Sequence, residues 1–390
     1  MSVTEPAGFV ASGVWCGVKA SPSALDLALV ATEDGQPVPA AAVFTANKAC
    51  AAPVQVSRAH LAASGGRAAA VVLNSGNANA ATGADGNSHA EETCALVASG
   101  LGCAAEEVLV CSTGLIGIPL PIDAIKSGIG PLVGARAADR DSAATAARAM
   151  MTTDTVLKET VIAGGGFTVG GMAKGAAMLA PHMATMLAVL TTDATASPAD
   201  LHHALTMAVD SSFNQITVDG SMSTNDTVIV LASGRAATAD GDALAGPLTE
   251  ACSQLAAAMV ADAEGATKLI EVRVTGAASA DEARRAARRV AEAQLVKCSF
   301  FGHDPYWGRV VSELGSAGVE FELDRVSVAY GGIVVCQGGV AVAHDHQAVT
   351  HHLAQRNVEV TADLGVGHAA ATILTADLTP SYIDENMTTS

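Results

Sequence analysis

Thr185 is the residue of this sequence whose surroundings most favour a chemical role. It lies in the segment KGAAMLAPHMATML at residues 174–187. A threonine hydroxyl is a weak nucleophile, but a cut before Thr185 would place a free α-amine beside the hydroxyl, and that amine can act as a general base. Small Ala184 leaves room for attack on its carbonyl, Pro181 breaks any preceding helix, and residues 186–190 form an apolar run typical of a buried strand. The pattern predicts self-cleavage at the Ala184–Thr185 bond, although on spacing alone an ordinary threonine at a strand start is the commoner interpretation.

Acyl transfer through Thr185 would require hydrogen-bond donors aimed at the oxyanion of the tetrahedral intermediate. The sequence STGLIG at residues 112–117 follows a short predicted strand at 108–111. A glycine-containing turn after a strand can present a backbone N–H and a hydroxyl together, although many such turns have no catalytic role. The STGLIG segment is therefore the best candidate for the oxyanion donors, without an assignment to particular residues.

Several motifs resemble those of one enzyme family. The MATML motif at residues 183–187 closely resembles the self-processing site of the ornithine acetyltransferase family, also called bifunctional glutamate N-acetyltransferase, which is cut between its alanine and its threonine. The STGLIG motif is similar to the oxyanion-hole motif of that family. Further matches are PAGF at 6–9, NSGNAN at 74–79, DGSMSTNDT at 219–227 and GHDPYWGR at 302–309. The resemblance spans essentially the whole chain, with departures at His182, in place of a small polar residue, and Tyr306, in place of asparagine.

The resemblance implies roles for individual residues. Thr185 would be the nucleophile, and Thr113 and Gly114 would form the oxyanion hole. Besides Thr185, five residues would bind substrate: Thr152, Lys174, Glu264, Asn386 and Ser390. Lys174 would suit a substrate carboxylate, and Glu264 would suit the cationic amine of ornithine.

Each of these substrate residues also has a plainer interpretation. Lys174 lies on a predicted Ala-Lys-Gly turn, where an exposed lysine is by default a solubilising charge. Glu264 would be a surface acid near a helix end, and the MTTD sequence at 151–154 would be a helix cap and turn. The tail from Asn386 to Ser390 is one residue shorter than the family pattern, and chain ends are more often frayed than functional.

Composition narrows the class of protein. The chain has 390 residues, half of them apolar but only 3% aromatic, so small aliphatic side chains must fill its core. A formal net charge of -18 argues against a nucleic-acid or anionic-membrane partner. Eight scattered cysteines without a paired motif are typical of buried thiols in a reducing cytoplasm. No stretch has the pattern of a signal peptide or a membrane span, so a cytoplasmic protein is expected.

Periodicity predicts a mixture of strands and helices. Strands are predicted at 67–73, 108–111, 186–191, 227–232, 270–275, 326–330 and 358–363, and helices at 89–99, 139–150, 197–209, 247–261 and 281–293. The glycines at 164–166 predict a hairpin between 160–163 and 167–169, and NSGN at 74–77 predicts a turn. This mixture indicates an α/β or α+β fold. The resemblance specifies stacked β-sheets flanked by helices, with an N-terminal-nucleophile-like, self-processing fold.

Three further patterns favour structural interpretations. His344-Asp345-His346 and His351-His352 carry possible metal ligands, but without cysteines or further acids at ligand spacing they are better explained by the start of a surface helix. The glycine-rich residues 164–175 lack the Gly-Lys-Ser/Thr ending of a phosphate loop. The arginine-rich residues 282–289 predict a solvated helix face with an Asp281–Arg285 pair. No metal and no cofactor are predicted.

Together these features predict an acetyltransferase of arginine biosynthesis. By resemblance, it would move an acetyl group from N2-acetylornithine to glutamate by a ping-pong mechanism through acetyl-Thr185, and some members of the family also use acetyl-CoA as the donor. The fragments 1–184 and 185–390 would stay together and assemble as a heterotetramer. Two alternatives remain at this point: an aminopeptidase of the related self-cleaving fold, and an uncleaved, non-enzymatic binding protein.

Overall fold

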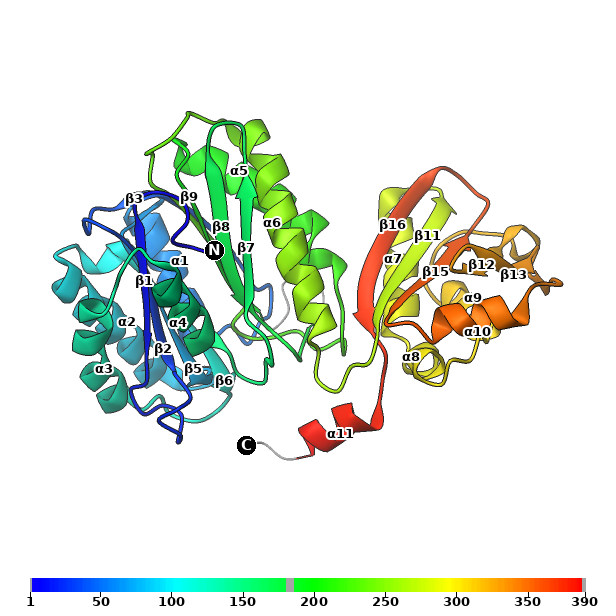
Figure 1. The fold of residues 1–390 in the computed structure, drawn as a ribbon, viewed down its shortest axis with the longest axis horizontal. Helices are drawn as coiled ribbons and strands as arrows, with labels where there is room; N and C mark the ends of the chain where they lie inside the picture. Colours follow the sequence, from blue (N-terminus) through cyan, green and yellow to red (C-terminus); the bar gives the residue numbers. More distant parts are fainter. Residues whose placement is uncertain (1, 180–185, 388–390) are drawn as a thin grey trace. The chain divides into compact units, whose positions relative to one another are not determined.

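The chain begins with a four-stranded sheet in the order β1–β2–β5–β6. In the computed structural model, which describes residues 2–179 and 186–387, these strands are Phe9–Val14, Leu27–Thr32, Ala70–Asn77 and Val108–Leu115. The first three strands pair antiparallel, whereas β5 and β6 pair in parallel. The parallel pairing places the C-terminal ends of β5 and β6 side by side (Figure 1).

A second sheet has six strands in the order β4–β3–β10–β9–β8–β7. They are Arg67–Ala68, Val38–Phe44, Thr227–Ala232, Leu187–Thr192, Thr168–Lys174 and Lys158–Ala163. Strand β9 pairs in parallel with β10 and antiparallel with β8, with Leu187 opposite Lys174. The segment between β8 and β9 contains the predicted cleavage site, so both sides of that site lie in one sheet.

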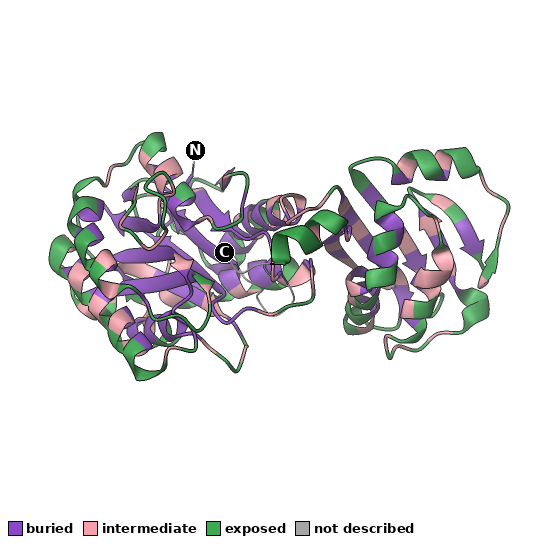
Figure 2. Ribbon diagram, turned by 90° about the horizontal axis from the view of Figure 1, so that it is seen from below, coloured by how far each residue is buried: buried purple, intermediate pink, exposed green. Residues whose placement is uncertain are grey.

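The two sheets share a core that also takes in helix α4 (Arg140–Met150). From the first sheet this core contains Ala28 and Val30, and from the second it contains Val189 and Ile229. Many of its members are alanines, as expected for a chain with few aromatic residues. The central strands β2, β9 and β10 are buried along their whole length (Figure 2).

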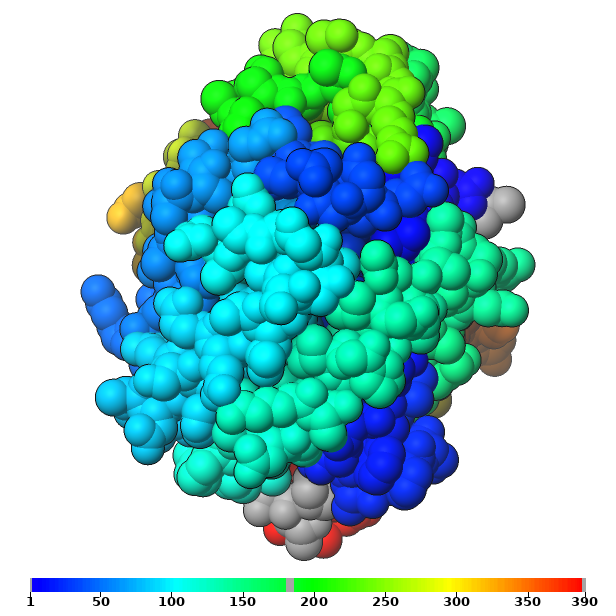
Figure 3. Space-filling view, turned by 90° about the vertical axis from the view of Figure 1, so that its left-hand side faces the viewer, coloured from blue at the N-terminus to red at the C-terminus, as the bar shows by residue number. Residues whose placement is uncertain are grey.

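Helices cover the outer faces of both sheets. The outer face of the first sheet packs on α1 (Ala52–Ala63), α2 (Gly83–Leu101) and α3 (Ile122–Gly134). Figure 3 shows the surface that this part of the chain presents, with residues 80–150 in cyan to green. On the second sheet, α5 (Pro198–Ser211) contacts β3 and β10, and Gln254 of α6 (Gly241–Ala261) accepts a hydrogen bond from Thr160 of β7. The sheets are therefore enclosed between helices.

The described residues form two units. Residues 2–179, 186–214 and 221–259 make up unit 1, which holds both of these sheets, and residues 215–220 and 260–387 make up unit 2. This division differs from the predicted fragments 1–184 and 185–390, which would both contribute strands to unit 1.

Unit 2 contains a six-stranded sheet in the order β14–β13–β12–β15–β11–β16. The strands are Val340–Ala341, Ile333–Gln337, Ser327–Tyr330, Asn357–Asp363, Leu269–Ala277 and Ala369–Ala376. Burial alternates along β11, where Ile270, Val272 and Val274 enter a core with the helices of one face. The helices of this unit are α7 (Ala280–Glu292), α8 (Gln294–Phe301), α9 (Trp307–Gly315), α10 (His346–Leu353) and α11 (Pro380–Asn386). Short 3-10 helices occur in both units, at Ala105–Glu107 of unit 1, Leu323–Arg325 of unit 2 and Phe213–Gln215, where the two units meet in the sequence.

The predicted α/β architecture, with sheets flanked by helices, is confirmed. Helix α4 begins after Asp139, whose carboxylate accepts the Ser142 N–H, and ends at the predicted Met150. The glycine-rich hairpin between β7 and β8 and the exposed Asp281–Arg285 pair are also present. Asp345 caps the start of α10, as the helix-start interpretation of the histidine cluster predicted.

Two predicted turns are wrong. The NSGN residues 74–77 and the Ser112-Thr113-Gly114 residues continue strands β5 and β6 instead of closing them. The polar and glycine residues mark an irregularity in the strand pairing, with a register shift at Gly76 and Asn77. The prediction that the cysteines are buried is correct for Cys94, Cys111, Cys252 and Cys336, but Cys298 is exposed; all eight are free thiols.

Candidate active site

Thr113 and Gly114 lie near the end of β6, where it pairs with the end of β5. Thr113 is only 3% exposed. Gly114 has a φ of 134°, and a Cβ at this position would lie 2.3 Å from the carbonyl carbon of Gly76 and 2.5 Å from the nitrogen of Asn77. Only glycine fits this backbone, because any other residue would be strained at this φ and its Cβ would clash with Gly76 and Asn77. The two candidate oxyanion donors are thus held in a rigid strand end.

Buried amide side chains fix the backbone around these donors. Asn225 Nδ2 donates to the carbonyl oxygens of Ala78 (2.6 Å) and Ser112 (2.9 Å). Ser112 Oγ donates to Asn74 Oδ1 (2.6 Å), and Asn74 Nδ2 donates to the carbonyl of Asn77 (2.8 Å). The sequence analysis gave no site role to Asn74 or Asn225, although both lie in motifs that it quoted. The signal that could have identified them is the presence of amide side chains directly beside apolar strands, since buried amides must be hydrogen-bonded.

Lys174 is the last residue of β8 and is buried, with 2% exposure. Its Nζ donates to Thr113 Oγ1 over 3.3 Å. The interpretation of Lys174 as an exposed lysine on a turn is therefore wrong, and the structure brings it to the predicted oxyanion donor. A lysine ammonium has no acceptor capacity, so Thr113 accepts this bond and keeps its own hydroxyl proton for another partner.

A second buried lysine and an aspartate extend the charged cluster. Asp154 accepts from Lys158 Nζ (2.6 Å), from the Gly175 N–H (2.7 Å) and from the Thr152 N–H (3.1 Å). The side chains of Asp154 and Lys158 are both inaccessible to solvent. Burial would raise the pKa of Asp154, but the charges of Lys174 and Lys158 and the Gly175 N–H together lower it to about 2. Asp154 is thus an ionised anchor for Gly175, directly after Lys174, and it also holds the backbone of exposed Thr152.

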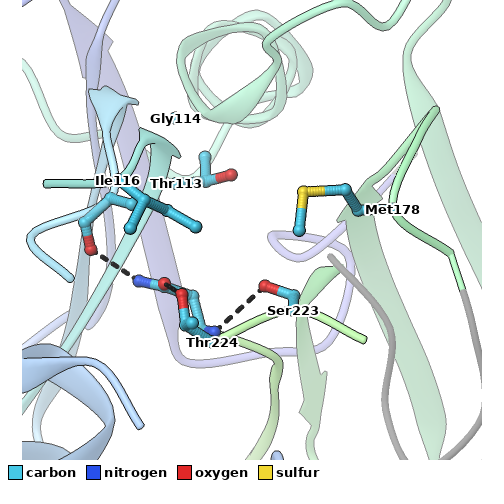
Figure 4. Close-up of a pocket in the computed structure, with 8 residues that line it drawn as sticks. Thr113, Gly114, Ile116, Met178, Ser223 and Thr224 are labelled. Carbon is cyan, nitrogen blue, oxygen red and sulfur yellow. Dashed lines mark hydrogen bonds between the residues drawn. The ribbon is translucent and has the colours of Figure 1, made fainter. Parts of the chain in front are cut away.

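A small pocket opens at the oxyanion donors. Figure 4 shows the side chains of Thr113 and Met178 at this pocket, together with Ser223 and Thr224. The lining residues, all from unit 1, are Ala78, Thr113, Gly114, Ile116, Met178, Ser223, Thr224 and Asn225. Hydroxyl-bearing residues and Gly114 therefore line it beside Ile116 and Met178. A carbonyl group of a small acyl substituent suits such a lining.

The predicted nucleophile and cleavage bond lie outside the described residues, as do His182 and Ser390. The description resumes at Met186, which precedes β9 and is buried. The N–H of Met186 donates to Asp226 Oδ1 over 2.9 Å. Like Asn74 and Asn225, Asp226 has no role predicted from the sequence.

The remaining predicted substrate residues belong to unit 2. Asn386, the last residue of α11, donates through Nδ2 to Glu264 Oε2 (2.7 Å) and to the carbonyl of Tyr382 (2.9 Å). Tyr382 itself donates to Asp219 Oδ2 over 3.3 Å. The structure thus brings the predicted Glu264 and Asn386 together, with Glu264 half-buried and Asn386 exposed.

The architecture of unit 1 defines the class of the protein. Two sheets packed on a shared core between helices, with buried polar side chains at the strand ends, make it an α/β protein of stacked sheets. The chain belongs to the ArgJ family, whose sequence model matches residues 10–389.

Curated relatives are similar to the chain over nearly its whole length, and a solved structure is similar over a little under half of it. The arginine biosynthesis bifunctional protein ArgJ of Thermobifida fusca is 47% identical over 387 residues, which cover 99% of both chains. The protein of the same name from Streptomyces coelicolor is 46% identical over 387 residues, again 99% of both chains. A solved structure of ornithine acetyltransferase from Mycobacterium tuberculosis, complexed with ornithine, has 43% sequence identity and a TM-score of 0.42, covering 46% of this chain and 94% of the solved chain.

These relatives confirm the family and the class of enzyme that the sequence predicted. The chain is an acetyltransferase of arginine biosynthesis. Within the part of the chain that the structure describes, no helix is long and apolar enough to cross a membrane. In the same part, no group of three or more histidine, cysteine or acidic side chains is arranged to hold a metal ion.

Proposed function

We propose that the chain cuts itself between Ala184 and Thr185 and then uses Thr185 to transfer an acetyl group from N2-acetylornithine to glutamate. The observation that carries this proposal is the hydrogen bond from buried Lys174 to Thr113, next to Gly114 and the small pocket. This group of residues matches the oxyanion and substrate motifs of the family. The ornithine bound to the Mycobacterium tuberculosis relative supports the choice of substrate.

In the first half-reaction, Thr185 Oγ attacks the acetyl carbonyl carbon of N2-acetylornithine. The α-amine of Thr185 takes the hydroxyl proton. Negative charge develops on the carbonyl oxygen, where the hydroxyl of Thr113 and the N–H of Gly114 stabilise it. The bond between the acetyl carbon and N2 then breaks, the proton passes to the leaving amine, and ornithine departs from an acetyl-Thr185 ester.

In the second half-reaction, the amine of glutamate attacks the same acetyl carbon, and the α-amine of Thr185 accepts the proton that is released. The threonine oxygen leaves, takes back a proton, and N-acetylglutamate departs. Lys174 places a positive charge beside the reacting carbonyl and suits a substrate carboxylate. In unit 2, Glu264, with Asn386 as its partner, supplies the acidic group that would hold the ornithine side-chain ammonium. Thr152 and Ser390 complete the proposed substrate residues.

The strand pairing supports the idea that the fragments remain associated after the cut. Strand β8 comes before Thr185, and β9 and β10 come after it. The pairs β8–β9 and β3–β10 join the two fragments within one sheet. We further propose that the fragments 1–184 and 185–390 assemble as a heterotetramer in the cytoplasm and that acetyl-CoA serves as a second acetyl donor.

The test is to trap the acetyl-enzyme. The purified protein is incubated with N2-acetylornithine without glutamate, and the fragments are weighed by mass spectrometry. The proposal predicts that the fragment starting at Thr185 gains one acetyl group, that ornithine is released, and that added glutamate removes the label as N-acetylglutamate. A protein that releases free acetate or amino acids from peptides, with no label on this fragment, would contradict it and favour the aminopeptidase.

A further inference from the structure

Asp226 is a buried carboxyl group at the point where the chain enters β9. It directly precedes β10 and is 0% exposed. Its Oδ1 accepts the N–H of Met186 over 2.9 Å, whereas its Oδ2 is buried and has no hydrogen-bond partner among residues 2–179 and 186–387. Burying a polar atom without a partner is costly, so this placement calls for a role beyond packing.

Met186 is held on both sides. Its N–H donates to Asp226, and its carbonyl accepts the N–H of Thr227 over 3.3 Å. The N–H of Met186 belongs to the peptide group that joins it to Thr185. Because a peptide group is planar, a hydrogen bond to its N–H constrains the direction in which the preceding residue leaves. The Asp226 side chain therefore acts one peptide group away from the proposed nucleophile.

The surroundings favour a neutral carboxyl at this place. Burial raises the pKa of Asp226 well above its usual range, and the Met186 N–H, the neighbouring hydroxyls of Ser223 and Thr45 and the charge of Lys174 only partly oppose this. A protonated carboxyl can accept a hydrogen bond through one oxygen and donate through the other. An asparagine side chain has the same two capacities in nearly the same shape.

We propose that Asp226 is a positioning residue for both self-cleavage and acetyl transfer: it anchors the N–H of Met186 and so sets the direction of Thr185. This inference rests on the proposed function and adds to it a residue that is not part of the oxyanion or substrate set. It acts through hydrogen-bond geometry and does not require a charge on Asp226.

Asp193 offers a matched control at the other end of β9. Its Oδ1 accepts the Thr168 N–H (2.7 Å) and its Oδ2 accepts the Ala7 N–H (3.4 Å). Asp193 thus also anchors backbone N–H groups with a carboxylate, but it lies beyond the C-terminal end of the strand, at Thr192. Loss of Asp193 tests whether any weakening of the strand's anchorage slows the reaction.

The experiment compares the wild type with Asp226→Asn, Asp226→Ala and Asp193→Ala. The cleaved fraction is followed with time by intact mass, kcat and KM are measured with acetylornithine and glutamate, and thermal unfolding monitors folding. We expect Asp226→Ala to cleave about tenfold more slowly or worse, and its cleaved form to lose kcat with little change in KM, because small misplacements of a reacting group are costly. Asp226→Asn and Asp193→Ala should stay within about threefold of the wild type, since both keep the Met186 anchor.

Three results would overturn the inference. Asp226→Ala could cleave at the wild-type rate, Asp226→Asn could be as slow as Asp226→Ala, or Asp193→Ala could be as slow as either. The Asn variant keeps the inference testable if Asp226→Ala does not fold, because a strongly slowed but folded Asp226→Asn contradicts a neutral positioning role. A wild-type protein that is never cut would instead contradict the proposed function itself. Failure of the inference about Asp226 is therefore distinguishable from failure of the proposed function.

Discussion

In unit 1 both faces of each sheet are covered, whereas unit 2 has a sheet with one covered face. The strands β9 and β10 of unit 1 are buried at every position, but burial alternates along β11 of unit 2. Except for exposed Gly114 and Thr152 of unit 1, the described candidate site residues follow the same difference. Thr113 and Lys174 are buried in unit 1, while Asn386 in unit 2 is exposed at the end of a seven-residue helix.

The difference separates two kinds of contribution. Buried donors held by strands and amide side chains are preorganised, and such groups lower the barrier of the chemical step. An exposed acid–amide pair contributes mainly to substrate binding, because water screens it and its geometry is less fixed. We therefore expect substitutions in unit 1 to change kcat or stability, and those in unit 2 to change KM.

The largest effect is expected from Asp154→Asn, which removes the carboxylate charge of a buried ion pair with Lys158. Removing one partner of a buried ion pair typically costs about 3–5 kcal/mol. Urea unfolding should show this loss. The control is Asp281→Asn, which breaks the exposed pair with Arg285 and should cost about 0–1 kcal/mol. Equal losses in the two variants would contradict the assignment of a buried charged cluster to unit 1.

Thr113→Val removes one proposed oxyanion donor while keeping the shape of the side chain. We expect kcat to fall by about 10²–10³, or about 2.7–4 kcal/mol in the barrier, with little change in KM. Steady-state kinetics with acetylornithine and glutamate measure both values. If Thr113→Val raised KM and left kcat unchanged, Thr113 would contribute to binding of the substrate in its ground state instead.

The Asp154 carboxylate should also make unit 1 sensitive to acid. Its pKa of about 2 in the folded protein lies below the usual value of about 3.9, so its stabilisation is complete above about pH 4 and is lost as the pH falls through about 2. The difference between these two pKa values corresponds to about 2.6 kcal/mol. Thermal unfolding of the wild type and Asp154→Asn between these pH values should show that their difference in stability becomes smaller as the pH falls. A difference in stability that stays constant with pH would contradict the assignment of this stabilisation to ionised Asp154.

The smallest effect is expected in unit 2. Glu264→Gln keeps an acceptor for Asn386 but removes the charge proposed to hold the ornithine ammonium. Since a hydrogen bond to a charged group contributes about 1.5–3 kcal/mol, KM for acetylornithine should rise about tenfold or more at nearly constant kcat. Glu385→Gln, a matched change at an exposed acid on α11, the helix that carries Asn386, should leave both constants unchanged. A fall in kcat for Glu264→Gln would contradict the expectation that substitutions in unit 2 change KM alone.

The sequence predicted elements best where burial is continuous or strictly periodic. Residues 227–232 form β10 with the predicted bounds, because an apolar run fully buried on both faces is easily recognised. The turn predicted at 74–77 was wrong, since polar and glycine residues there serve an irregular strand pairing instead of a chain reversal. Strands β1 and β16 are among the elements that were missed, because stretches rich in small residues carry little pattern.

The candidate site could be predicted from the sequence only in part. Motifs identified Thr113 and Lys174, but no local pattern shows that a lysine is buried, because burial depends on strands far away in the chain. Asp226 and Asn225 were likewise missed as site residues, since their partners Met186 and Ser112 are distant in sequence.

Tyr306 is a position where the sequence departs from the family pattern. Its ring lies beneath Arg309, with 5.4 Å from the guanidinium carbon to the ring centre.

The central claim is that Thr185 becomes the N-terminus of a fragment that stays in the sheet of the other fragment. The most direct test is the intact mass and N-terminal sequence of the natively purified protein, beside Thr185→Ala. The account predicts two co-purifying fragments, one beginning Thr-Met-Leu, and a single chain of 38.8 kDa for the variant. A wild type that remains a single 38.8 kDa chain would contradict it.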